Sequence, residues 1–167
     1  MVVIAGRRVS TPDLIVVGAA AVMLVDSLLP WYGYDASGWH PTYTAFQSGF
    51  LAFFPMLFVL LVGGFAATRA WNAADGTPDG AIGPGRLTWN LLYLIADAAA
   101  FLLLLLFWAT LPGLTGASIG AKIGVYVAIV VTLAQAAGAF LAMVAAGEQF
   151  AVGSLRWAKS LRLRRTS

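Results

Sequence analysis

A few polar side chains stand inside segments that are otherwise apolar, and these are the residues with the most chemical potential. Asn90, Tyr93 and Asp97 are spaced three and four residues apart, so a helix would place them on one face. Gln135 lies at a similar depth in another apolar segment, which predicts a hydrogen bond between Asp97 and Gln135. Polar groups at membrane depth need a partner or a water-filled cavity. Three interpretations stay open: a structural clasp between helices, a titrating Asp97 in a proton or ion path, and contact with another subunit.

Two charged residues lie near the opposite end of the predicted bundle. Asp26 stands close to the C-terminal end of the first apolar segment, where the helix dipole disfavours an anion. Lys122 begins the last apolar segment and has a side chain long enough to reach that depth. The sequence therefore suggests an Asp26–Lys122 ion pair, and the alternative is an Asp26 that faces water.

The residue types that most enzyme and metal sites require are scarce in this sequence. The chain has no cysteine, which excludes disulfides, thiol redox chemistry and thiolate metal ligands. His40 is the one histidine, so the chain by itself forms no histidine cluster for a metal. No pattern combines a nucleophile with a base and an oxyanion site, and no phosphate-binding loop is present. We expect no catalytic residues, no metal and no cofactor.

The elements that position the polar residues are predicted to be transmembrane helices. Sixty per cent of the 167 residues are hydrophobic and 10% are charged, which makes the lipid bilayer the expected surroundings. A span needs about 20 mostly apolar residues, and four segments satisfy this requirement: 13–31, 47–69, 87–111 and 122–147. We predict an all-α fold, a four-helix transmembrane bundle with up-down-up-down topology. A cleaved signal peptide is the alternative for the first segment, but no small-x-small cleavage motif follows it.

The distribution of Lys and Arg predicts the orientation in the membrane. Lys122 falls on one side, and all other basic residues fall on the opposite side: Arg7, Arg8, Arg69, Arg86, Arg156, Lys159, Arg162, Arg164 and Arg165. Because basic residues concentrate in cytoplasmic segments, both termini should be cytoplasmic. The cytoplasmic segments are then 1–12, 70–86 and 148–167, and the outer loops are 32–46 and 112–121. The basic tail 148–167 is expected to contact anionic lipid, and nucleic acid is not an expected partner despite a net charge of +3.

Two further sets of residues suggest surfaces for packing or docking. The first outer loop concentrates aromatic side chains, which form either an interfacial belt or a docking surface: Trp31, Tyr32, Tyr34, Trp39 and Tyr43. The beginning of the last apolar segment has small residues at four-residue spacing, namely Gly120, Gly124 and Ala128. Such a stripe lets another helix approach closely, and it favours packing within the bundle slightly over packing in a dimer.

One stretch resembles a known group of proteins. The motif SLLPWY at 27–32, and Trp39 followed by AFQSGFLA at 45–52, are similar to uncharacterised actinobacterial four-span membrane proteins. The resemblance covers about residues 13–50 and implies the plasma membrane of a bacterium, without an activity. We expect a non-enzymatic accessory or scaffolding subunit of an envelope, lipid-transport or respiratory complex, bound to a larger membrane protein. The alternative is a small oligomeric transporter or channel in which Asp97 titrates.

Overall fold

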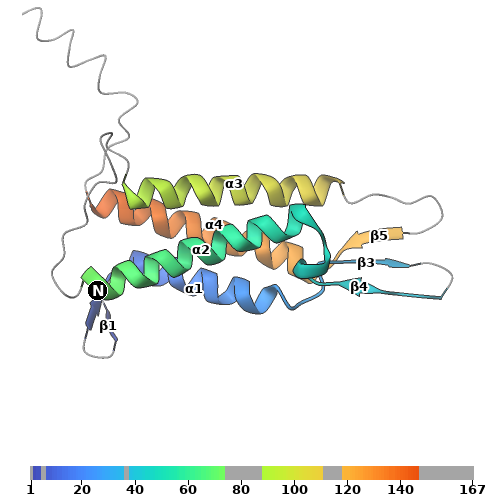
Figure 1. The fold of residues 1–167 in the computed structure, drawn as a ribbon, viewed down its shortest axis with the longest axis horizontal. Helices are drawn as coiled ribbons and strands as arrows, with labels where there is room; N and C mark the ends of the chain where they lie inside the picture. The colour runs from blue at the N-terminus through green and yellow to red at the C-terminus, as the bar shows by residue number, and fades with distance from the viewer. Residues whose placement is uncertain (1, 5–6, 36–37, 74–87, 111–117, 147–167) are drawn as a thin grey trace, which may run out of the picture.

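Four helices form the body of the protein. The computed structural model describes residues 2–4, 7–35, 38–73, 88–110 and 118–146. Helices α1 (Thr11–Asp26), α2 (Phe50–Ala73), α3 (Trp89–Thr110) and α4 (Ile123–Ala145) pack in a ring, so that each helix contacts its two neighbours. Consecutive helices run in opposite directions (Figure 1). The predicted four-helix bundle with up-down-up-down topology is confirmed.

The first helix differs most from its predicted bounds. Ser10 caps α1, because its hydroxyl accepts a hydrogen bond from the backbone N–H of Asp13. The helix ends at Asp26, five residues before the predicted end of the 13–31 segment. Pro30 keeps the helix from reaching Trp31, since the residue before a proline disfavours helical geometry, and the backbone N–H of Trp31 donates instead to the carbonyl of Tyr43.

Three of the four helices are long and apolar enough to cross a membrane, namely α2, α3 and α4. They have 24, 22 and 23 residues, which corresponds to about 33–36 Å at 1.5 Å per residue. Helix α1 has 16 residues, or about 24 Å. Helix α2 starts three residues later than predicted and extends to Ala73, within the segment 70–86 that was predicted to be a loop. The protein is therefore a multi-pass membrane protein with three candidate spans.

The two loops that were predicted to lie outside the membrane form a small sheet, which the all-α prediction lacked. Strands β3 (Tyr32–Asp35), β4 (Thr42–Tyr43) and β5 (Ser118–Ala121) form an antiparallel sheet in the order β4-β3-β5. Strand β5 belongs to the second outer loop, and its Ala121 pairs with Tyr32 of the first. A short 3-10 helix, Ala45–Gln47, connects the sheet to α2. The sheet projects from the end of the bundle opposite to the N-terminus (Figure 1).

A second, two-stranded unit lies at the other end of the bundle. Strands β1 (Val2–Ile4) and β2 (Arg7–Val9) pair as an antiparallel hairpin beside the start of α1 (Figure 1). The hairpin carries Arg7 and Arg8 at the same end of the bundle as Arg69, whereas Lys122 lies at the end that carries the sheet. Among the described residues, the two ends therefore differ in basic charge in the way that the sequence predicts.

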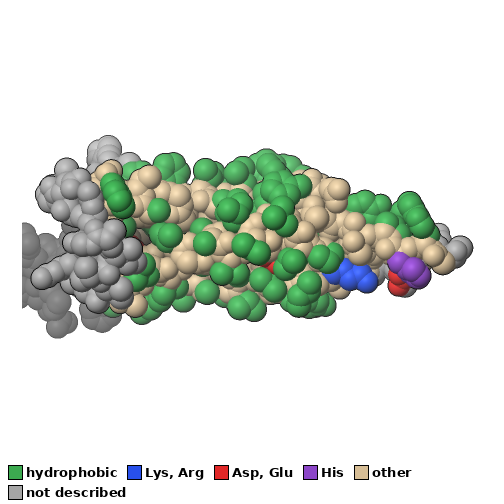
Figure 2. Space-filling model, turned by 90° about the horizontal axis from the view of Figure 1, so that it is seen from below, with side chains coloured by type: hydrophobic (Ala, Val, Ile, Leu, Met, Phe, Trp, Pro, Cys, Tyr) green, Lys and Arg blue, Asp and Glu red, His purple; other side chains and the backbone are tan. Residues whose placement is uncertain are grey.

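The helices bury small, polar and some large apolar side chains, and they also expose many large apolar ones. Buried positions include Ala19, Ala52 and Ala100, whereas Leu102 is 65% exposed and Val130 is 65% exposed. Hydrophobic side chains are distributed along the whole length of the helices on the face drawn in Figure 2. The exposed apolar side chains distinguish the bundle from a protein stable in water, where large apolar patches are rarely exposed. This exposure indicates that the helices contact lipid.

Candidate functional site

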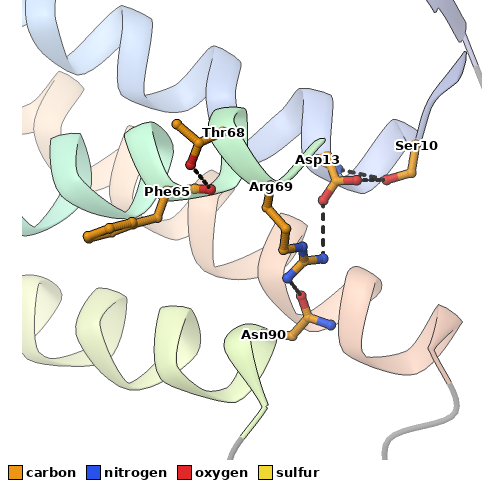
Figure 3. Close-up of polar contacts among 6 residues, drawn as sticks. All are labelled: Ser10, Asp13, Phe65, Thr68, Arg69 and Asn90. Carbon is orange, nitrogen blue, oxygen red and sulfur yellow. Dashed lines mark hydrogen bonds and ion pairs between the residues drawn. The ribbon is translucent and has the colours of Figure 1, made fainter. Parts of the chain in front are cut away.

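The polar interior of the bundle begins with a cluster at its inner end, the end that carries the β1–β2 hairpin. Arg69 on α2 lies between α1 and α3, and its Nη1 donates to Oδ1 of Asn90 at 2.8 Å (Figure 3). Its Nη2 lies 3.6 Å from Oδ1 of Asp13, whose Oδ2 accepts a hydrogen bond from the Ser10 hydroxyl. The guanidinium carbon also lies 5.7 Å from the centre of the Tyr93 ring. Arg69 therefore connects three helices at one point.

Asp13 and Arg69 were not predicted as site residues. In the sequence, Arg69 counted only as evidence for orientation, and Asp13 only marked the start of the first apolar segment. The sequence did contain one indication of the Asp13–Arg69 ion pair. An acid and a base at the inner ends of consecutive antiparallel helices lie at the same depth. Both side chains are more than four-fifths buried, with exposed fractions of 16% for Arg69 and 17% for Asp13. At that depth the ion pair is only partly screened by solvent.

We predict that replacing Arg69 by leucine lowers the free energy of unfolding by about 1–3 kcal/mol, because Asp13 then loses its cation and Asn90 loses a charged donor. Thr68 provides the matched control, since it is exposed and its hydroxyl donates only to the Phe65 carbonyl of its own helix at 2.9 Å (Figure 3). Unfolding of both variants in mild detergent, followed by circular dichroism, measures the difference. An Arg69→Leu protein as stable as Thr68→Ala would contradict this prediction.

The polar side chains continue from this cluster toward the centre of the bundle. Asn90, Tyr93 and Asp97 lie on the buried face of α3, with exposed fractions of 4%, 3% and 0%. Further along the same face, the buried side chains are apolar: Ala100, Leu104 and Phe107. The polar track therefore starts at the inner end and stops near the middle of α3.

Gln135 connects α4 to two other helices. Its Nε2 donates to the carbonyl of Val16 in α1 at 3.1 Å and to the carbonyl of Val59 in α2 at 3.0 Å. Its Oε1 has no hydrogen-bond partner, and neither oxygen of Asp97 has one. The Nε2 of Gln135 is thus turned toward α1 and α2, and the hydrogen bond between Asp97 and the Oε1 of Gln135 stays a prediction.

Asp26 and Lys122 do not form the predicted ion pair. Asp26 is 1% exposed, and its two carboxyl oxygens lack a hydrogen-bond partner, so the alternative of a water-facing Asp26 is also wrong. The side chain of Lys122 instead crosses strand β3, where its Cε lies 2.9 Å from the position that a Cβ on Gly33 would occupy. The backbone N–H of Lys122 donates to the Trp31 carbonyl at 2.8 Å, and this start of α4 directs the side chain along the sheet.

Trp31 belongs to the core of the protein and not to the predicted aromatic surface. It is 0% exposed, its Nε1 donates to the backbone carbonyl of Asp26 at 3.1 Å, and its ring packs against Phe107. Gly124 gives the ring its space, because a Cβ at that position would lie 2.2 Å from Cδ1 of Trp31. Gly124 and the fully buried Ala128 thus face the interior, where Gly124 meets Trp31 and not a neighbouring helix, whereas Gly120 lies in strand β5 and not in a helix.

The other four aromatic residues lie on the projecting sheet. Tyr43 stacks between Tyr32 and Tyr34, at centroid distances of 4.8 and 5.9 Å, and Trp39 meets Tyr34 edge to face at 6.1 Å. Burial raises the pKa of Tyr32, so its hydroxyl is neutral at physiological pH. Trp39 is 65% exposed. The sheet therefore has a stacked, rigid base and an exposed aromatic tip.

The tip of the β3–β4 hairpin also carries a pair of polar residues. Nδ1 of His40 lies 2.6 Å from Oδ1 of Asp35, and both side chains are more than half exposed. In the part of the chain that the structure describes, no three His, Asp or Glu side chains gather into a group that could hold a metal ion. The predicted basic tail 148–167 lies outside the described residues. The chain matches no protein-family model, no curated protein and no solved structure.

Proposed function

We propose that this protein is a non-enzymatic accessory subunit of a larger membrane complex, and that it binds its partner through the tip of the projecting sheet. One observation carries this proposal, namely the exposed Trp39 on a sheet that extends beyond the helices (Figure 1). Trp and Tyr are enriched at protein interfaces because their rings supply rigid contact area. Phe46 at the base of the sheet is also exposed, at 52%.

The position of Trp39 favours docking over an interfacial aromatic belt. Strand β3 runs for four residues from Tyr32 to Asp35, and at about 3.3 Å per residue it carries the hairpin about 10 Å beyond the helices. The headgroup layer on one side of a bilayer is only about 5–8 Å thick. A ring at the hairpin tip therefore reaches the outer edge of this layer or passes it. Tyr32 and Tyr43 lie nearer to the helices, at the usual depth of a belt.

Helix α1 serves as the fourth span in this proposal. Its outward side chains are apolar, and Val22, Leu24 and Val25 are 49%, 55% and 64% exposed. With the ring of four helices kept together, α1 faces the same lipid as α2 and α4, which flank it. Arg7 and Arg8 of the β1–β2 hairpin then lie on the cytoplasmic side, and the β4-β3-β5 sheet lies outside, in agreement with the positive-inside rule. A bacterial plasma membrane is the proposed location.

The test is co-purification of the tagged protein from its native membrane in a mild detergent, after brief cross-linking. We expect one large membrane protein at stoichiometric yield, and at least a tenfold lower yield of it with Trp39→Ala. Trp71→Ala is the matched control, because Trp71 is 59% exposed on the opposite end of the bundle in α2. Equal partner yields from the two variants would exclude the hairpin tip as the docking site. Purification without any stoichiometric partner, or as a homo-oligomer, would refute the accessory role.

A further inference from the structure

We infer that the middle of the bundle is a one-sided proton-binding site, in which Asp97 holds an exchangeable proton that it can donate to Oε1 of Gln135. This site is separate from the proposed docking at the sheet and does not depend on it. It would also supply the titrating group that a proton-coupled transporter requires.

The surroundings of Asp97 favour the neutral acid. The side chain is 0% exposed, and both of its carboxyl oxygens lack a hydrogen-bond partner. A buried carboxylate without a compensating cation or donor is so costly that the group takes up a proton instead. A metal cation would need more oxygen ligands than one carboxylate and one amide provide, so a proton is the ligand that fits.

The charged and titratable groups of the neighbouring helices do not supply a counter-ion at this depth. On α2 the only described one is Arg69, which lies two turns away and is engaged with Asp13 and Asn90. On α4 it is Tyr126, which is 50% exposed on the outside of the bundle. On α1 they are the two acids Asp13 and Asp26, at opposite ends of the helix. Tyr93 on α3 itself is the nearest titratable side chain along the polar track.

Gln135 provides the acceptor. Because Nε2 of Gln135 donates to two backbone carbonyls, the amide orientation is determined and Oε1 is left as an unfilled acceptor. Asp97 lies 13 residues before the end of α3, and Gln135 lies 12 residues after the start of α4. At 1.5 Å per residue these are depths of about 20 and 18 Å from the outer end of the bundle. The two helices pack against each other, so Asp97 and Gln135 lie at similar depth on neighbouring helices.

The order of side chains along α3 makes the site accessible to protons from one end of the bundle only. Asn90 and Tyr93 lie on the same buried face of α3 between Asp97 and the Arg69 cluster at the inner end, whereas Ala100, Leu104 and Phe107 separate Asp97 from the outer end with buried apolar groups. Polar side chains can relay protons, and a packed apolar layer prevents proton leakage. Proton exchange should therefore proceed from the inner end.

Infrared spectroscopy of the full chain in lipid nanodiscs tests the inference. The expected result at neutral pH is a carbonyl stretching band of a protonated carboxylic acid that disappears in Asp97→Asn and persists in Asp26→Asn. Asp26→Asn is a stringent control because Asp26 is the other described carboxyl that is buried without a partner. If Asp97→Asn does not fold, Asp97→Glu should retain a protonated acid with a shifted band. A neutral-pH spectrum without such a band, or a band that only Asp26→Asn removes, would overturn the inference.

Two further variants test the hydrogen bond and the direction of access. Gln135→Leu should move the band to higher wavenumber, because the carboxyl loses its acceptor, and an unmoved band would refute the hydrogen bond. Transfer to D2O should shift the band in the unmodified protein, and Tyr93→Phe should slow this shift at least tenfold. An equally fast shift in Tyr93→Phe would refute access along the polar track.

Discussion

Replacing Trp31 by alanine is expected to lower the free energy of unfolding by about 3–5 kcal/mol, the largest single effect that we predict for this protein. The ring is fully buried where α1, the sheet and α4 meet, and it packs against Phe107 and the backbone of Gly124. Truncation leaves a cavity that the surrounding backbone cannot fill, because Trp31 itself is held by hydrogen bonds to Tyr43 and Lys122. It also leaves the Asp26 carbonyl without the indole N–H.

Trp39 provides the control for this experiment, since the same change at a side chain that is 65% exposed creates no cavity. Both variants are unfolded in mild detergent, and the transition is followed by circular dichroism. We expect Trp39→Ala to stay within about 0.5 kcal/mol of the unmodified protein. Similar losses for the two variants would mean that Trp31 does not carry the packing between the sheet and the helices.

Gly63 is the second position where a small change should have a large effect. A Cβ on Gly63 would lie 2.0 Å from Cβ of Ala20, so α1 and α2 touch at this point and a methyl group has no room. The same contact lies beside Gln135, whose Nε2 is 3.5 Å from that Cβ position. Gly63→Ala must therefore push the two helices apart and lengthen the hydrogen bonds from Gln135 to Val16 and Val59. We expect a loss of about 1–3 kcal/mol.

The adjacent glycine makes this prediction sharp. Gly64 is exposed, and a Cβ there would meet no atom within 4 Å. Gly64→Ala should be neutral or stabilising by up to about 1 kcal/mol, because alanine is the better helix former. Thermal unfolding in the same detergent compares the two variants. If Gly63→Ala unfolds at the temperature of Gly64→Ala, α1 and α2 are not in the close contact that the structure shows.

Local features of the sequence were sufficient to predict the helices. An apolar run of more than 20 residues needs the backbone hydrogen bonds of a helix in lipid, so α2, α3 and α4 could be found to within about four residues at each end. The spacing of Asn90, Tyr93 and Asp97 placed them on one face for the same reason. The short connections implied antiparallel neighbours. Pro30 was visible in the sequence too, but its effect on the end of α1 was underestimated.

The sheet and the exact polar contacts depend on residues that are far apart in the chain. Strand β5 pairs with β3 across about 85 residues, and no local pattern in 112–121 indicates a strand. Equal depth along antiparallel helices suggested that Asp97 pairs with Gln135 and Asp26 with Lys122. Depth alone, however, does not specify how each helix is rotated about its axis. That rotation turns the Gln135 amide toward Val16 and Val59 and brings Arg69 to Asp13 and Asn90.

The sequence by itself thus determined that this is a membrane protein with four helices, one aromatic loop and polar residues at the middle of the bundle. These features follow from hydrophobicity and helical period, which each segment carries alone. Only the tertiary structure decided that Trp31 is buried while Trp39 is exposed, and that Gly63 rather than Gly64 is the point of contact between helices. Neighbouring or identical residues differ in this way because packing depends on the surface that another segment presents to them.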